Sequence, residues 1–416
     1  MPDLWASIVS TTIARLYLLV VGLVSVTVTA RWLGPTGQGI VAAATGWATA
    51  FASLGSLSLG QVALHRATER RGQEWLGDTL GTLIAIGISI TAASWIVAGA
   101  VHVITRGDAF THLSPRTLLL AFLLVPFLLW EQYGSSLLTA TDRVSVYYRV
   151  QLIARTIAVL LMIAAWRLQL PVDAALLIAL ISQMLVAAGG MRQLFLHAGG
   201  KIRFTGEATR TLLLGGLKLH VHQLAAFVFS WLAVLMISHY RDPAQTGIYQ
   251  FAASLINVMY VVPIAASMLL SARVAQDGAD RAWDQQRKFV LLLPLLMGVL
   301  AAIAAVVAPF AIQIVAGAKY APAVPLFRLL LFSVVGMTFA TVMGPQWIGR
   351  GLFWQMSALA LASATIHALL IFLWIPRYGM YGAAYATVVL SLLAFIGNGV
   401  LVFRCETRYR AREVSA

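Results

Sequence analysis

The chain has 416 residues, of which 60% are hydrophobic and only 11% are charged, and its mean hydropathy is +0.85. A soluble domain cannot bury that share of apolar surface, so the composition excludes an ordinary water-soluble protein. The formal net charge of +14 is compatible with nucleic-acid binding, but the distribution of the basic residues favours a membrane topology.

Long uninterrupted apolar runs predict membrane-spanning helices. Each run has about 20 residues, the length that crosses about 30 Å of hydrocarbon, whereas transmembrane strands would alternate over about ten residues. We therefore predict an all-α, polytopic membrane bundle of about twelve transmembrane helices. The expected spans are 8–30, 39–64, 79–105, 117–139, 147–166, 172–195, 211–238, 246–272, 288–316, 325–347, 352–375 and 380–403.

The basic residues of the connecting loops predict the orientation. With a cytoplasmic N-terminus, the inward loops, the C-terminal tail and the adjacent helix ends carry 18 Lys and Arg. The outward loops and their adjacent helix ends carry 8, and the remaining three of the 29 lie deep inside spans. This asymmetry follows the positive-inside rule. It predicts a multi-pass protein of the inner (plasma) membrane with both termini in the cytoplasm, and no nucleic-acid partner.

Motifs for cofactor chemistry are missing from the sequence. Cys405 is the only cysteine, which excludes an intramolecular disulfide and a cysteine-based metal site. There is no Walker A motif, no Rossmann glycine pattern and no metal-ligand cluster. We therefore expect no catalytic residue, no metal and no cofactor, and transport that runs downhill or on a gradient of H⁺ or Na⁺. The first apolar run is too long for a signal peptide and is expected to remain as the first helix.

Three basic side chains are predicted to line a cavity. Arg15 and Lys218 each lie about seven residues into a span, and His222 follows Lys218 at i+4 on the same helix face. Charge at membrane depth costs about 2.5 to 3.5 kcal/mol on insertion scales and usually marks a substrate or ion path. We interpret these residues as substrate-binding cations. Snorkelling of Arg15 to the headgroups and a neutral packing role for His222 are the alternatives.

Glu131 and Arg155 lie at similar depth on consecutive predicted spans. This placement predicts an intramembrane ion pair or a proton or substrate relay. A buried pair is weak evidence for stability, because desolvation offsets the Coulomb attraction. A structural and a functional role both stay open. Of the four ionisable residues deep inside spans, Arg15, Arg155 and Lys218 are cations and Glu131 is the one carboxylate, which favours an anionic cargo.

The sequence indicates an internal duplication in which the second copy follows the first by about 207 residues. LGPTGQGIVAAATGWATAF (33–51) resembles RDPAQTGIYQFAASLINVM (241–259), and LPVDAALLIALIS (170–182) resembles IPRYGMYGAAYATVVLS (375–391). TDR at 141–143 falls opposite IGR at 348–350. Resemblance by apolar composition alone is the alternative.

The duplication predicts two lobes. Six spans in each copy is an even number, so both copies have the same orientation, as in parallel-repeat transporters. We predict an N-terminal six-helix lobe at 1–200 and a C-terminal six-helix lobe with a short basic tail at 201–416. The polar stretch near 196–210 is predicted to connect them on the cytoplasmic side.

The stretch ARLYLLVVGLVSVTVTARWLGPTGQGIVAAATGWATAFASLGSLSLG (14–60) resembles the opening of bacterial polysaccharide-export flippases. The shared features are an arginine or polar residue in the first helix, an R-x-L-G-P-x-G-x-G motif, and a second helix that ends in a small-residue L-G segment. The chain is similar over nearly its whole length to the O-antigen and lipid-linked oligosaccharide flippases of the multidrug/oligosaccharidyl-lipid/polysaccharide exporter superfamily.

The resemblance implies a fold, a function and partners. It implies two pseudo-symmetric six-helix lobes around a central cavity. It also implies translocation of a polyprenyl-pyrophosphate-linked oligosaccharide by alternating access, for cell-surface polysaccharide and lipopolysaccharide biosynthesis. Membrane lipids, a glycan polymerase and glycosyltransferases are the implied partners. Arg15 fits a pyrophosphate contact by position and Lys218 by chemistry, whereas Glu131 and Arg155 match no family motif.

Three other functions are separable by experiment. A cation-coupled drug exporter of the same superfamily would need acidic and aromatic cavity residues, but Glu131 is the only acidic residue deep within the spans, since Asp173 lies at the end of one. A membrane glycosyltransferase or polymerase is disfavoured by the short outward loops. A non-transporting component of a glycan assembly complex would leave export intact when the gene is deleted.

Overall fold

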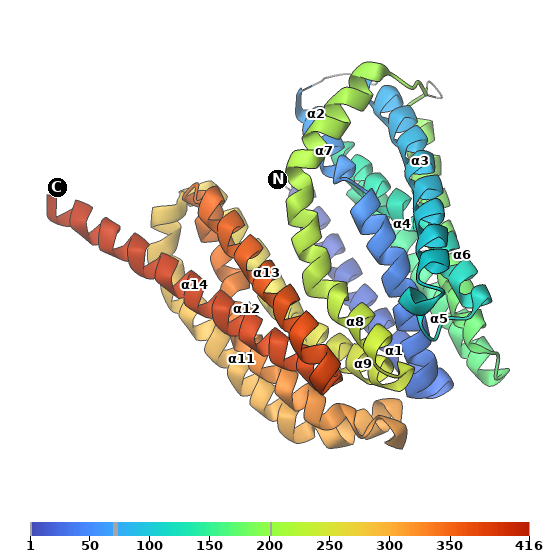
Figure 1. Cartoon of the computed structure of the whole chain (residues 1–416). Helices are drawn as coiled ribbons and strands as arrows, with labels where there is room; N and C mark the ends of the chain where they lie inside the picture. The colour runs from blue at the N-terminus through green and yellow to red at the C-terminus, as the bar shows by residue number, and fades with distance from the viewer. Residues whose placement is uncertain (1, 70–73, 200–201, 416) are drawn as a thin grey trace. The chain divides into compact units, whose positions relative to one another are not determined.

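A computed structural model shows a helical protein, coloured from blue at the N-terminus to red at the C-terminus in Figure 1. It describes residues 2–69, 74–199 and 202–415; the side chains outside the description are those of 2–16, 19, 68, 69, 74, 221, 222, 284, 285 and 405–415. The helices are α1 (Pro2–Gly55), α2 (Leu59–Glu69), α3 (Glu74–Ile104), α4 (Pro115–Ala140), α5 (Val144–Arg167), α6 (Val172–His197), α7 (Gly206–Phe227), α8 (Ala233–Tyr240), α9 (Pro243–Met259), α10 (Val261–Asp277), α11 (Ala279–Ala316), α12 (Ala323–Gly349), α13 (Phe353–Tyr378) and α14 (Met380–Ser415). Short 3-10 turns η1 (Asp108–Phe110) and η3 (Ala318–Tyr320) and a π-helical turn η2 (Val228–Leu232) complete the fold.

The helices are long and apolar enough to cross a membrane. Among the described residues, ten helices qualify as spans, and eleven qualify if the bent pair Val20–Gly55 and Leu59–Ala67 is counted as one span. The chain is therefore a multi-pass helical membrane protein, as the sequence predicts. The expected count of about twelve depends on dividing α1 in two.

A glycine divides α1 into two arms. Gly34 has φ 64° and ψ −177° inside the helix, a conformation that glycine adopts without the steric cost of a Cβ. Pro35 follows and has no N–H to donate, so the helical hydrogen bonding is interrupted at the same point. The two arms correspond to the predicted spans 8–30 and 39–64.

The second arm of α1 ends inside the predicted span 39–64. Residues 56–58 form a turn, and α2 then continues at 47° to the preceding helix. Leu57 and Ser58 both have positive φ, at 46° and 55°. Such a conformation costs about 1–3 kcal/mol for a residue other than glycine. Two such residues in a row therefore make the turn strained, and the surrounding structure must stabilise it.

Two compact units make up the chain: Met1–Gly247 and Ile248–Ala416. In the first unit α4 packs on α1, α2 and α6, and α7 packs on α2. In the second unit α12 packs against α10, α11 and α14. The division at 247 places α7 and α8 with the first six spans. The predicted boundary at 200 describes the sequence repeat and stays a prediction.

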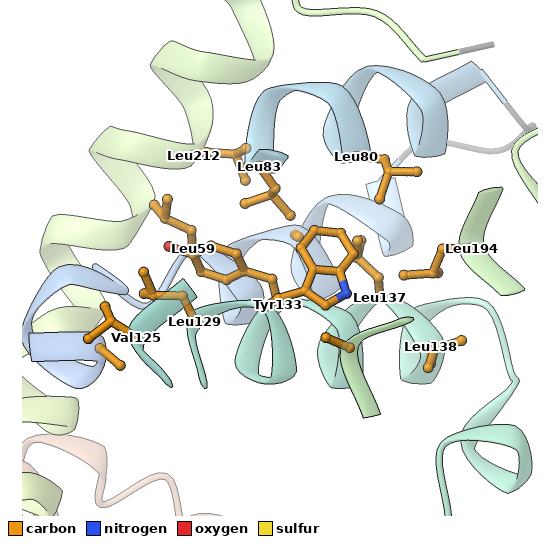
Figure 2. Close-up of a cluster of buried hydrophobic side chains, with 14 of the residues drawn as sticks. Leu59, Leu80, Leu83, Val125, Leu129, Tyr133, Leu137, Leu138, Leu194 and Leu212 are labelled. Carbon is orange, nitrogen blue, oxygen red and sulfur yellow. The ribbon is translucent and has the colours of Figure 1, made fainter. Parts of the chain in front are cut away.

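The core of the first unit is a leucine-rich cluster around Tyr133 of α4. Figure 2 shows Tyr133 among Leu59 of α2, Leu83 of α3 and Leu129 of α4. Its ring is 1% exposed, and its hydroxyl donates a hydrogen bond of 3.1 Å to the carbonyl oxygen of Ser56, in the α1–α2 turn. A buried phenol needs such a partner, so Tyr133 ties α4 to the helix break.

The two motif copies of the predicted duplication touch each other in the first unit. A Cβ added to Gly39 would lie 1.7 Å from the carbonyl oxygen of Pro243, and a Cβ added to Gly247 would lie 1.9 Å from that of Pro35. The aligned glycines therefore bring α1 and the start of α9 into direct backbone contact. The contact is reciprocal, which supports the alignment of Pro35 with Pro243 and Gly39 with Gly247.

Candidate functional site

Arg15 lies on the first arm of α1, and its side chain falls outside the described residues. A hydrogen bond made by the nearby Tyr17 shows which part of α5 lies beside this part of α1. The hydroxyl of Tyr17 hydrogen-bonds the hydroxyl of Thr156 on α5 at 2.9 Å. The level of Arg15 on α1 is therefore close to that of Arg155, which precedes Thr156.

Lys218 lies on the exposed side of α7. Gly216 of the same helix faces the α1–α2 turn, because a Cβ on Gly216 would lie 2.3 Å from the carbonyl oxygen of Leu57. Two residues along a helix is a rotation of about 200°, so Lys218 projects away from that turn and its side chain is exposed. The side chain of His222 lies outside the described residues. The assignment of Arg15, Lys218 and His222 as substrate-binding cations stays a prediction.

Glu131 is held by three hydrogen-bond donors from α5 and α6. The amide nitrogen of Gln151 lies 2.5 Å from Oε1, the amide nitrogen of Gln183 lies 2.9 Å from Oε2, and the hydroxyl of Tyr147 lies 3.4 Å from Oε1. The Gln151 amide also donates to the Tyr147 hydroxyl at 2.8 Å. Gln151 and Gln183 are each 7% exposed, so this is a largely buried cage of neutral donors around one carboxylate.

The predicted partner of Glu131 is not among these donors. In the part of the chain that the structure describes, no ion pair within 4.0 Å joins Glu131 to Arg155. The physical reason is that two glutamine amides from neighbouring helices fill the positions around the carboxylate. Arg155 lies one turn beyond Gln151 on α5, and its charge acts on Tyr147 together with that of Glu131. The relay interpretation of Glu131 and Arg155 stays a prediction.

A polar pocket opens at the α1–α2 turn, on another face of α4. Its volume is about 190 Å³. The lining comes from four elements and consists of hydroxyl, amide and glycine groups: Ser56, Ser58, Gly60, Gln61, Gln132, Tyr133, Ser135, Ser136 and Gln223. We call this the break pocket. Within the described residues it is bordered by neutral polar groups, in a chain that is 60% hydrophobic.

Close backbone approaches build the break pocket. A Cβ on Gly60 would lie 2.7 Å from the Oγ of Ser136 and 2.9 Å from the carbonyl oxygen of Gln132, so α2 begins directly against α4. On α7, Gln223 follows Gly216 by seven residues, which returns it to the same helix face. The two glycines therefore bring α2 and α7 close enough for their polar side chains to line one pocket.

Ser58 is the least satisfied group of the break pocket. It is 6% exposed, and its Oγ has no hydrogen-bond partner among the described residues. A serine that precedes a helix normally has extended backbone and accepts a hydrogen bond from an amide of the first turn. Ser58 has φ 55° instead and makes no such bond, so a residue that lines the pocket has an unpaired hydroxyl.

His220 lies on α7 and was not predicted as a site residue, whereas His222 was predicted to line the cavity. It follows Gly216 at i+4, on the face of α7 that meets the helix break. Its ring lies near the backbone of Leu54 at the end of α1, and its Nδ1 has no hydrogen-bond partner among the described residues. The signal that could have identified it is the Gly215–Gly216 pair, because small residues mark the face on which helices approach closely.

An apolar cavity, which we call the apolar groove, also contacts Tyr133. It has a volume of about 570 Å³, is lined by α3, α4 and α6, and shares Tyr133 with the break pocket. Trp95 joins it to a second apolar cavity of about 480 Å³ that reaches His102 and Phe110. Tyr133 thus lines both a polar pocket and an apolar groove, an arrangement suited to an amphiphile.

Comparisons with known proteins agree with this architecture. The family model described as "Polysaccharide biosynthesis protein" matches residues 4–272. A comparison with curated protein sequences finds no match. Among solved structures, the Lipid II flippase MurJ in an inward closed conformation superposes with a TM-score of 0.78 at 13% identity, covering 94% of this chain and 87% of MurJ.

Multidrug transporters share the same fold at lower similarity. An inward-facing MATE family transporter of the MOP superfamily gives a TM-score of 0.65 at 14% identity, over 95% of this chain and 96% of the transporter. The MATE multidrug transporter DinF-BH gives 0.58 at 16% identity, over 97% and 96% of the two chains. At these identities the comparison shows the fold, which is that of the MOP superfamily.

Proposed function

Because the chain belongs to the polysaccharide biosynthesis protein family, we propose that it is a flippase for a lipid-linked oligosaccharide. Its cargo is a polyprenyl-pyrophosphate-linked glycan that moves from the cytoplasmic to the outer leaflet of the inner membrane by alternating access. The similarity in fold to MurJ, described as a Lipid II flippase, supports a lipid-linked cargo. Export of such a lipid serves cell-surface polysaccharide assembly, including O-antigen.

One observation carries the proposal: a neutral polar pocket and an apolar groove meet at Tyr133. A lipid-linked glycan has a polar head and a long apolar chain, and each end needs surroundings of its own polarity. The groove is lined almost entirely by apolar side chains, and the break pocket by hydroxyl and amide groups. A small water-soluble substrate would gain nothing by contact with the apolar surface of the groove.

Arg15, Lys218 and His222 are proposed to bind the anionic head of the cargo. Arginine and lysine form charge-assisted hydrogen bonds with phosphate oxygens. Lys218 is exposed on α7, where it is accessible to a ligand. The proposed partners are the lipid-linked oligosaccharide, membrane lipids, a polymerase and glycosyltransferases, with H⁺ or Na⁺ as the coupling ion.

Glycan export in a strain that lacks this gene and redundant flippases tests the proposal. Arg15→Ala and Lys218→Ala should each reduce surface glycan by at least about tenfold, and the double variant should abolish it, while the protein stays in the membrane. Arg116→Ala is the matched control, because it removes an exposed arginine from the first turn of α4. Full export by the double variant would disprove the cation assignment, and wild-type export by the deletion strain would disprove the flippase.

The Glu131 cage favours one second candidate, a cation-coupled drug exporter. A carboxylate held by neutral donors within a span can take up a proton or a cation, and MATE transporters share the fold. Drug accumulation measured with and without the gene separates the two functions. Lower accumulation of cationic drugs in the presence of the gene, with unchanged glycan export, would favour the exporter.

A further inference from the structure

The break pocket presents hydrogen-bond donors that the protein itself does not use. The hydroxyl of Ser58 has no partner in the described part of the chain, although the residue is more than nine-tenths buried. The amides of Ser58 and Gly60 donate to no backbone carbonyl among the described residues, whereas those of Leu59 and Gln61 donate to Ser56 and Ser58. The hydroxyl of Ser58 and the amides of Ser58 and Gly60 are therefore unused donors at the turn.

The helix that starts at this turn adds a favourable field. α2 has 11 residues, and its first turn contributes Gly60 and Gln61 to the pocket lining. The N-terminus of a helix carries a partial positive charge and attracts anions. In membrane transporters, broken helices present such N-termini to anionic groups of the substrate. The carbonyl oxygen of Ser56, by contrast, already accepts from Leu59 and Tyr133.

The lining is better suited to an anion than to a cation. Among the described residues it contains no carboxylate, and seven residues besides Tyr133 and Gly60 bear a hydroxyl or an amide. The hydroxyls of Ser56, Ser135 and Ser136 already donate to backbone carbonyls, so the hydroxyl of Ser58 and the glutamine amides are the remaining side-chain donors. A dehydrated cation at membrane depth needs carboxylate or converging carbonyl ligands, whereas hydroxyl and amide N–H groups solvate oxyanions. The volume of about 190 Å³ equals the share of about six water molecules, which accommodates a compact oxyanion.

We propose that the break pocket is an oxyanion site that takes the diphosphate group of a lipid-linked substrate. Its donors are the hydroxyl of Ser58, the backbone amide of Gly60 and the side-chain amide of Gln223. This inference rests on the proposed function and extends it, because the site uses neutral donors distinct from Arg15 and Lys218. The apolar groove, which shares Tyr133 with the break pocket, lies next to the end of the diphosphate that carries the polyprenyl chain.

Direct binding to the purified full-length protein tests the site. Labelled inorganic pyrophosphate is titrated onto wild type, Ser58→Ala and Ser58→Asp, and a polyprenyl diphosphate in nanodiscs is added as competitor. Ser89→Ala is the matched control, because Ser89 is exposed on α3 and its hydroxyl bonds Ala85 in its own helix. Thermal unfolding of each variant confirms that the fold is intact.

The expected result is a distinct order of affinities. Ser58→Ala should weaken pyrophosphate binding by about tenfold or more, as expected for loss of a hydrogen bond to a charged group. Ser58→Asp should abolish binding by charge repulsion, and Ser89→Ala should match wild type. Displacement of pyrophosphate by the polyprenyl diphosphate assigns the site to the lipid head.

Three results would overturn the proposal. The first is pyrophosphate binding that is absent in wild type or unchanged in both Ser58 variants. The second is sodium binding that Ser58→Asp strengthens, which would make the pocket a cation site. The third is pyrophosphate binding that the lipid does not displace, which would leave a site for a free oxyanion. In each case glycan export by the same variants shows separately whether the proposed flippase function stands.

Discussion

Replacement of Gly39 by alanine should destabilise the protein through a single methyl group. The added Cβ would lie 1.7 Å from the carbonyl oxygen of Pro243, 2.7 Å from its carbon and 2.9 Å from the amide nitrogen of Gly247. Real Cβ atoms essentially never approach other atoms more closely than 3.0 Å. The methyl group therefore fits only if the backbones of α1 and α9 separate by more than 1 Å, because no flexible side chain can move aside.

The expected magnitude follows from two opposing terms. Overpacking of a close contact costs about 1–3 kcal/mol and more where backbone must move. Alanine in place of glycine inside a helix returns up to about 1 kcal/mol. The clash dominates, so we expect a net loss of about 2 kcal/mol and a drop of roughly 2 °C in the apparent Tm of the detergent-solubilised protein.

Gly22→Ala is the control for this experiment. Gly22 lies on the same helix, and an added Cβ would meet no atom within 4 Å. Its Tm should stay unchanged or rise. Gly247→Ala should act like Gly39→Ala, and the double variant should cost less than both losses combined, since one separation relieves both clashes. Equal Tm values for Gly39→Ala and Gly22→Ala would refute the backbone contact.

Two carboxylate-to-amide substitutions should behave differently. Glu131→Gln places an amide NH₂ against the donors of Gln151 and Gln183, and an unpaired buried donor costs about 1–3 kcal/mol; an unchanged Tm would contradict the cage. Asp280→Asn removes the 3.0 Å ion pair with Arg350, but the Asp280 side chain is 59% exposed. Its loss should therefore be below about 1 kcal/mol and should vanish in high salt, and a larger, salt-independent loss would contradict that.

The membrane spans could be predicted because the length of an apolar run alone determines whether it can cross the bilayer. The run predicted at 172–195 is α6 (Val172–His197), and that predicted at 325–347 is α12 (Ala323–Gly349). The interruption of the run at 39–64 was not predicted. Its hydropathy is continuous, and the turn depends on the backbone conformation of Leu57 and Ser58, which tertiary contacts with Tyr133 and Gly216 support.

The candidate site could be predicted only in part. Burial of Glu131 followed from its position in a span, but its donors come from three residues 16 to 52 positions away, and hydropathy carries no information on such contacts. Charge inside a span identifies Arg15 and Lys218 as candidates. The hydroxyl and amide groups of the break pocket are neutral, so charge does not identify them, and their sequence signal is the Gly- and Ser-rich segment LGSLSLG at 54–60.

The reciprocal contact of Gly39 and Gly247 also bears on how such a chain could have arisen. Residue for residue, it is an isologous interface of the kind found in homodimers with twofold symmetry, in which each partner offers the other the same patch. A shorter ancestor with a single copy of the motif could have paired with itself through this glycine before the gene was duplicated and fused. Fusion of two such copies would make the pairing intramolecular, and would leave each copy free to diverge outside the contact.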